Sequence, residues 1–203
     1  MRRLLDYGEH GALLECADLA ETLGLLRTLR EAPYDDIVET VPGARTIFLR
    51  LARPLTRQRR RELVALEPTA VGSTTGEELT IAVRYDGKDL EEVARLCELS
   101  PEEVVAAHTG QLWRVGFCGF APGFGYLHGE HAQLRVPRRT APRTSVPAGA
   151  VGLADVWTGV YPRRGPGGWQ LIGRTEQAMW DLDRDPPALL QPGTAVRFVD
   201  SAA

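Results

Sequence analysis

The sequence predicts an α+β protein in which a small α+β sandwich, residues 1–80, is followed by a β-barrel, residues 81–203. Two observations carry this prediction. In the first part, apolar runs with the spacing of strands alternate with two amphipathic helical stretches. In the second part, residues 116–175 hold short apolar and aromatic runs between closely spaced glycines and prolines. That pattern is typical of short strands and tight turns in a closed or sandwiched β structure.

The first domain is predicted from the spacing of its apolar residues. Asp18 can cap a helix in which leucines recur at three- and four-residue intervals, and Pro33 ends it. Thr56 can begin a second amphipathic helix, which Pro68 closes. The expected strands are residues 4–7 and 12–16, which form a hairpin, and then 37–41, 46–51 and 79–85. The last strand is expected to close the sheet of this domain, with the helices on one face.

The second domain is expected to begin with two short helices and to continue with strands. Residues 73–76 are interpreted as the connector between the domains. Residues 89–97 have a helical pattern, and the next helix opens with Ser100, Pro101 and Glu103 in the positions of a capping box. The expected strands are 112–118, several short pieces within 116–175, and 195–199.

Charge, hydropathy and cysteine content exclude several classes of partner. The net charge is -3 and the pI is near 5.9, which gives no bulk electrostatic case for nucleic acid. The basic run 57–61 is interpreted as the solvated face of the second helix. No apolar run approaches the roughly 20 residues of a membrane-spanning helix, and the N-terminus lacks the features of a signal peptide. Three widely separated cysteines favour a reducing compartment. We therefore expect a cytoplasmic protein with neither nucleic acid nor a membrane as partner.

No constellation of catalytic residues stands out in the sequence. Ser145 lacks the flanking glycines of a nucleophile elbow. His128 and His131 lie three residues apart in a segment that reads as a loop, and two such histidines need a third ligand to hold a metal. We therefore predict no metal site and leave the catalytic residues unassigned.

Arginines set among rigid turns are the strongest local signal for a binding site. Arg138, Arg139 and Arg143 share a segment stiffened by prolines, and Arg174 follows a later Gly/Pro turn and strand. Guanidinium groups on a rigid backbone suit an anionic ligand, because little entropy is lost on binding. If the turns converge, an anion or a partner's carboxylate is needed between the charges. The alternative is a solvated edge that discourages strand pairing.

His108 and two tyrosines each allow two interpretations. His108 ends the second short helix, where it is either a charge that favours the helix dipole or a site residue next to the central stretch. Tyr126 and Tyr161 are either ligand contacts or barrel core with satisfied hydroxyl groups.

Four motifs carry a resemblance to a known family. They are GFAPGFGYL at 119–127, PRRTAPRTSVPAGAVG at 137–152, TGVYP at 158–162 and PGGWQLIGRT at 166–175. In content, order and spacing they resemble the family of the 5-oxoprolinase B subunit, which is also described as Kip-type histidine-kinase inhibitors and as allophanate hydrolase subunit 1. The resemblance covers nearly the whole chain. The chain departs from the common pattern at Cys118 and at 154–157, and the second departure alters a candidate partner surface.

The resemblance implies a ferredoxin-like domain over 1–80 and a cyclophilin-like β-barrel over 81–203. It implies ATP-dependent cleavage of 5-oxoproline to glutamate, with ATP and Mg²⁺ used in a complex with two further subunits, A and C, of which C is cyclophilin-like. Two alternatives stay open: inhibition of a sensor histidine kinase through its dimerisation helices, and a role like that of urea carboxylase, for which biotin is not excluded. The residues expected to contact substrate are His108, Phe120, Pro122, Tyr126, Arg138, Arg139, Arg143, Tyr161 and Arg174.

Overall fold

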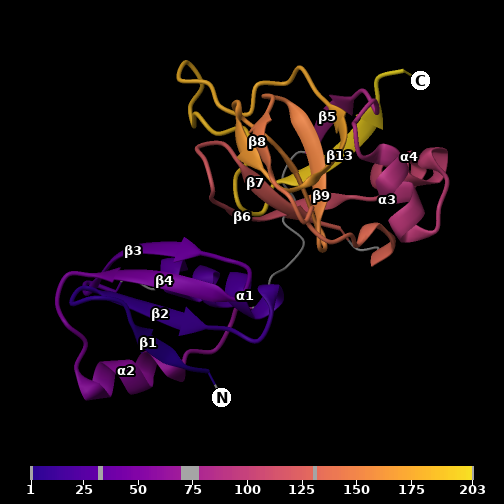
Figure 1. Cartoon of the computed structure of the whole chain (residues 1–203). Coiled ribbons are helices and arrows are strands. Elements are labelled where there is room, and N and C mark those ends of the chain that lie inside the picture. The colour runs from indigo at the N-terminus through magenta and orange to yellow at the C-terminus, as the bar shows by residue number, and fades with distance from the viewer. Residues whose placement is uncertain (1, 32–33, 70–77, 130–131, 203) are drawn as a thin grey trace. The chain divides into compact units, whose positions relative to one another are not determined.

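The computed structural model describes residues 2–31, 34–69, 78–129 and 132–202. The chain divides into two compact units, Met1–Thr74 and Thr75–Ala203, which we call unit 1 and unit 2. Figure 1 shows both units along the chain. The predicted connector at 73–76 lies outside the described residues.

Unit 1 is an antiparallel sheet covered by two helices. Its strand order is β1-β2-β4-β3. The strands are β1 (Leu4–Asp6), β2 (Gly11–Glu15), β3 (Ile37–Pro42) and β4 (Thr46–Leu51), and the helices are α1 (Leu19–Glu31) and α2 (Arg57–Val64). Both helices pack on the same face of the sheet, because one buried cluster joins Leu25 of α1 and Leu63 of α2 to Leu14 and Leu49 of the sheet.

Local signals set where the helices of unit 1 begin. The Asp18 carboxylate accepts a hydrogen bond from the Glu21 N–H at 2.8 Å, and the Thr56 hydroxyl accepts one from the Arg59 N–H at 3.1 Å. The predicted Asp18 cap is therefore confirmed, and so is the predicted start of the second helix at Thr56. In the arginine-rich run of α2, Arg59 forms a two-point ion pair with Asp36.

The prediction that strand 79–85 closes the first sheet is wrong. Residues Leu79–Val83 form β5, which lies in unit 2 and pairs in parallel with β13 (Ala195–Asp200). Pairing there buries Ile81 and Val83 completely in the core of unit 2, whereas in unit 1 β1 already occupies the position beside β2. A ferredoxin-like domain reads β-α-β-β-α-β, while the described part of unit 1 reads β-β-α-β-β-α. The ferredoxin-like assignment is therefore not confirmed.

Unit 2 is a nearly closed β-barrel. Its main sheet has the order β12-β9-β10-β7-β6-β13-β5. The two end strands meet where Arg84 and Arg174 exchange backbone hydrogen bonds of 2.8 and 2.9 Å. The remaining strands of this sheet are β6 (Trp113–Cys118), β7 (Gly125–His128), β9 (Ala150–Ala154), β10 (Trp157–Val160) and β12 (Gln170–Arg174). The barrel prediction is thus confirmed in its coarse form.

Two helices pack on the barrel, and a two-stranded sheet accompanies it. Helices α3 (Leu90–Cys97) and α4 (Pro101–Thr109) lie side by side (Figure 1) and bury Val93 and Val104 in the barrel core. The predicted capping box of α4 is confirmed by hydrogen bonds in both directions between Ser100 and Glu103. Strands β8 (Arg143–Val146) and β11 (Gly165–Gly167) form a separate pair, and η1 (Ala132–Leu134) is one 3₁₀ turn. Within the described ranges, no helix has the length and apolarity needed to cross a membrane.

Candidate functional site

A connected set of aromatic side chains covers one side of the barrel, and we call it the aromatic wall. Its members come from β6, the turn after it, β7, β10 and the segment up to β12. Phe124 lies at its centre, 5.1 to 5.4 Å from the rings of Tyr126, Tyr161 and Trp169. The wall comprises Phe117, Phe120, Phe124, Tyr126, Trp157, Tyr161 and Trp169. Phe124, Tyr161 and Trp169 are buried, so their edge-to-face contacts form a rigid apolar base. The surface of the wall is made by the other members, which are half-buried or exposed: Phe117, Phe120, Tyr126 and Trp157.

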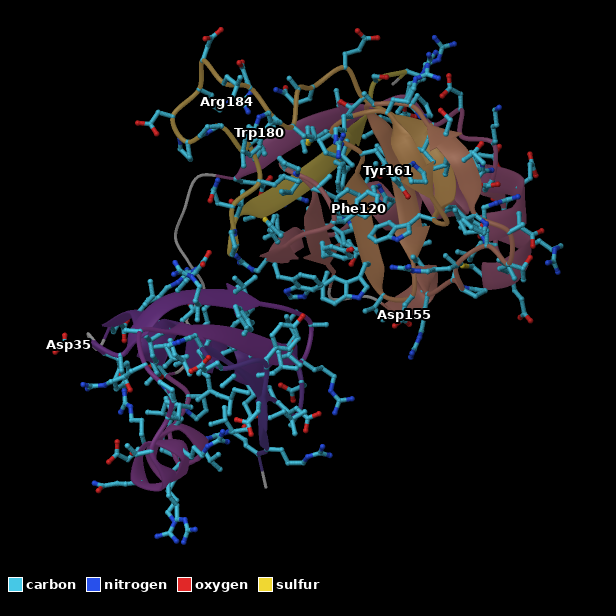
Figure 2. All side chains as sticks on the ribbon, turned by 60° about the vertical axis from the view of Figure 1, so that its left-hand side comes forward. Asp35, Phe120, Asp155, Tyr161, Trp180 and Arg184 are labelled. Carbon is cyan, nitrogen blue, oxygen red and sulfur yellow. The ribbon has the colours of Figure 1, made fainter. Side chains whose placement is uncertain are left out.

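Phe120 is the most exposed member of the aromatic wall. It has φ 68°, a left-handed conformation that costs a bulky residue of order 1–3 kcal/mol, and its side chain is 61% exposed. The turn is closed by hydrogen bonds between Gly119 and Phe124, in which the Gly119 N–H donates at 3.1 Å, and between Phe124 N–H and the Ala121 carbonyl at 3.0 Å. Figure 2 shows Phe120 next to Tyr161, whose ring centroid is 6.2 Å away. The fold therefore holds an exposed apolar side chain in a strained position.

Pro122 contributes to an open apolar depression beside Phe120. This depression has a volume of about 490 Å³ and is also lined by Trp180 and Leu190 from the long segment between β12 and β13. Pro122 and Phe120 thus share one surface, as the sequence prediction grouped them.

Two of the predicted arginines converge on a carboxylate of this same chain. Arg139 and Arg143 donate hydrogen bonds of 2.8 and 2.7 Å to Oδ1 of Asp89, a residue that is only 3% exposed. The other oxygen, Oδ2, accepts the Leu171 N–H at 2.6 Å. We call Asp89, Arg139 and Arg143 the Asp89 clamp. The expectation that an anion or a partner's carboxylate lies between these two arginines is therefore wrong, because Asp89 of this chain takes that place. The alternative of free charges at a solvated edge is wrong for the same reason.

Asp89 joins three segments that are distant in sequence. It precedes α3, its own N–H donates to the Leu171 carbonyl of β12 at 2.9 Å, and its side chain holds the proline-rich segment. In the sequence, Asp89 stands out only as the start of a helix. An acidic residue at that position is an ordinary helix-start signal, so nothing local distinguished it. Its partners lie 50 to 82 residues along the chain.

Arg138 lies on the aromatic wall instead of the Asp89 clamp. Burial raises the pKa of the Tyr126 phenol, and the charge of Arg138 and a hydrogen bond from it oppose that rise. Burial also raises the pKa of Tyr161, which a hydrogen bond from the backbone of Trp169 and the charge of Arg138 oppose. Tyr161 is buried with a satisfied hydroxyl group, so its interpretation as core is confirmed.

His108 lies inside the barrel core, apart from the aromatic wall and the Asp89 clamp. Its ring is fully buried, with Nδ1 2.7 Å from the Tyr85 hydroxyl and Nε2 2.9 Å from the Thr158 hydroxyl. Burial lowers the pKa of His108 to about 3, so the imidazole is neutral at physiological pH. The interpretation of His108 as a charge favouring the helix dipole is therefore wrong.

The His108 ring is expected to stay neutral in the native protein from pH 8 down to pH 4.5. Its ring proton resonances should therefore not shift in an NMR titration, while an exposed histidine shifts near pH 6.5. Because the unfolded chain binds a proton here and the native state does not, this residue makes stability fall as the pH drops from 6.5 towards 3. A midpoint near 6.5 for His108 in the folded protein would contradict this assignment.

Arg174 belongs to another part of the barrel. Its guanidinium pairs with the Asp86 carboxylate at 3.0 Å, and the Arg84 guanidinium pairs with the same carboxylate at 3.2 Å. These pairs lie where the two end strands of the barrel meet. Among the residues that the structure describes, no group of three or more potential ligands could hold a metal ion. His131 lies outside those residues.

Comparisons with known proteins place this architecture in a family. Residues 2–190 match the model of the carboxyltransferase domain, subdomain C and D. The chain is similar to the B subunit of 5-oxoprolinase from Haemophilus influenzae, with 41% identity over 172 residues, 81% of this chain and 79% of that protein. It is also similar to the 5-oxoprolinase B subunit of Bacillus subtilis, with 51% identity over 113 residues, 56% of this chain. That match spans only 47% of the Bacillus subtilis protein.

Solved structures agree with this placement. The crystal structure of TTHA0988 matches 99% of this chain at 38% identity with a TM-score of 0.78, and the match covers 41% of that longer chain. The urea carboxylase of Kluyveromyces lactis matches 98% of this chain with a TM-score of 0.76, but at 17% identity, so the likeness shows the fold alone. The family model and the curated relatives together show that this chain belongs to the family of the 5-oxoprolinase B subunit.

Proposed function

We propose that the chain is the B subunit of an ATP-dependent 5-oxoprolinase that opens the lactam of 5-oxoproline to give glutamate. The observation that carries the proposal is the 41% identity, along 81% of this chain, to a curated 5-oxoprolinase B subunit. The A and C subunits of that enzyme are the proposed partners, and ATP with Mg²⁺ is consumed in the assembled complex.

The side chains at the candidate site support a binding role within such a complex. Phe120 and Tyr126 offer flat apolar surface, and the Arg138 guanidinium offers a positive charge with several N–H donors. These groups bind and orient a ligand but are poor proton-transfer catalysts near neutral pH. In the proposed complex the general acid and base for lactam opening come from the partner proteins, and the barrel supplies rigid contacts.

Deleting the gene for this chain is expected to abolish consumption of 5-oxoproline by the cell, because the proposed complex works only when assembled. The measurement is the concentration of 5-oxoproline in the medium over time, with complementation by the intact gene as control. Consumption at the parental rate in the deletion strain would contradict the proposal. The kinase-inhibitor alternative instead predicts unchanged consumption and increased autophosphorylation of a sensor kinase.

A further inference from the structure

Arg138 differs from its neighbours in what its guanidinium contacts. Arg139 and Arg143 both form ion pairs with Asp89. Arg138 is exposed and lies beside the Tyr126 hydroxyl. Within the described ranges, no carboxylate lies at ion-pair distance from Arg138. Its charge is therefore available to a ligand, while the charges of the other two arginines are compensated inside the chain.

The backbone on both sides of Arg138 is fixed to the start of β12. The Pro137 carbonyl accepts a hydrogen bond from Nε2 of Gln170 at 3.2 Å, and the Arg139 N–H donates to the Gly168 carbonyl at 2.8 Å. The Asp89 clamp anchors the same segment a second time. The guanidinium is thus presented on a backbone that has little conformational entropy left to lose on binding.

Arg138 and the aromatic wall together match one class of ligand. The two hydrogen bonds that flank Arg138 set residues 137–139 alongside residues 168–170, so Arg138 lies next to the part of the aromatic wall that contains Trp169. A hydrogen bond from Arg138 to Tyr126 places the guanidinium at that ring. A guanidinium offers parallel N–H donors that fit the two oxygens of a carboxylate, and aromatic rings pack against a flat ring.

We propose that Arg138 and the aromatic wall form a subsite for a small carboxylate carried on a flat ring. This inference rests on the proposed function for the choice of ligand, which is 5-oxoproline. Arg138 binds the carboxylate, the half-buried Tyr126 of the wall contacts the lactam ring, and the Asp89 clamp positions Arg138 without touching the ligand.

An NMR titration of the full chain tests this subsite without relying on catalytic activity. The indole N–H signals of Trp157 and Trp169 are suitable probes, because their rings lie 6.0 and 5.5 Å from Tyr126. We expect 5-oxoproline to shift these signals in a saturable way. We expect 2-pyrrolidinone, the same lactam without a carboxylate, to bind at least about tenfold more weakly, as loss of a charge-assisted contact predicts.

Two substitutions separate the role of Arg138 from general charge effects. Arg138→Gln should weaken 5-oxoproline binding about tenfold or more and remove the preference over 2-pyrrolidinone, with an unchanged melting temperature. Arg135→Gln is the matched control, because Arg135 is three residues upstream, 67% exposed and paired with Asp155. It should bind 5-oxoproline as the wild type does.

Three results would overturn the subsite: no shifts with 5-oxoproline, equal binding of both lactams, or unchanged binding in Arg138→Gln. If 5-oxoproline does not bind but Arg138→Gln weakens assembly with the C subunit, the carboxylate comes from a protein partner and the small-ligand subsite is wrong. Carboxylate-dependent binding in a chain whose deletion leaves 5-oxoproline consumption intact would support the subsite and reject the proposed function.

Discussion

Replacing Asp89 by alanine is expected to lower the free energy of unfolding of unit 2 by about 3–5 kcal/mol. The substitution leaves Arg139 and Arg143 without their shared carboxylate, and it removes the acceptor for the Leu171 N–H. A half-buried charge without a partner lowers the stability of the folded state. Because Arg139 is partly exposed, we expect the loss in unfolding free energy to be about 3 kcal/mol, the low end of this range. The melting temperature should fall by roughly 10 °C or more.

The measurement is denaturant unfolding followed by tryptophan fluorescence. All four tryptophans of the chain lie in unit 2, at positions 113, 157, 169 and 180, so the signal reports on the barrel alone. Asp86→Ala is the matched control, three residues upstream, because its ion pairs with Arg84 and Arg174 are exposed and should contribute at most about 1 kcal/mol. If Asp89→Ala costs no more than Asp86→Ala, the Asp89 clamp is not a structural junction.

Local sequence signals predicted the starts of helices well. Asp18 caps α1 as expected, α2 begins at Thr56 as expected, and Ser100 with Glu103 forms the expected capping box. These signals act between residues three positions apart, so they can be recognised without knowledge of the fold. The strand boundaries near 46–51 and 195–199 also follow from short β-branched and apolar runs.

Long-range pairing was not predictable in the same way. The pattern of β5 is that of a strand, but its partner β13 lies more than 110 residues away in the chain and nothing within 79–85 specifies it. Asp89 was missed for the same reason. The arginines of the proline-rich segment could be recognised in the sequence. The carboxylate that pairs with two of them belongs to Asp89, which immediately precedes α3 and is 50 or more residues away.

His108 illustrates how burial changes the meaning of a residue. At the end of a helix, an exposed histidine would carry charge and favour the helix dipole. Here Tyr85 and Thr158 bind both ring nitrogens inside an apolar core, and burial lowers the pKa of the ring to about 3. Sequence position alone does not distinguish these two environments.

Omitting this chain from a reconstituted 5-oxoprolinase is expected to reduce glutamate formation at least about a hundredfold. A chain that supplies rigid substrate contacts contributes through orientation, and losing that orientation costs several kcal/mol of the barrier. ATP hydrolysis measured without 5-oxoproline serves as control. If this hydrolysis continues when the chain is omitted, the complex has lost the coupling of ATP hydrolysis to ring opening. If it stops, the complex has lost the use of ATP itself.

The decisive measurement is glutamate released from 5-oxoproline and ATP by the purified A and C subunits, with and without this chain. We expect release with all three proteins present, close to none without this chain, and full release when Arg135→Gln replaces the wild type. Release at the full rate by the two partner proteins alone would contradict the proposed function. So would the absence of release from an assembled complex of all three proteins.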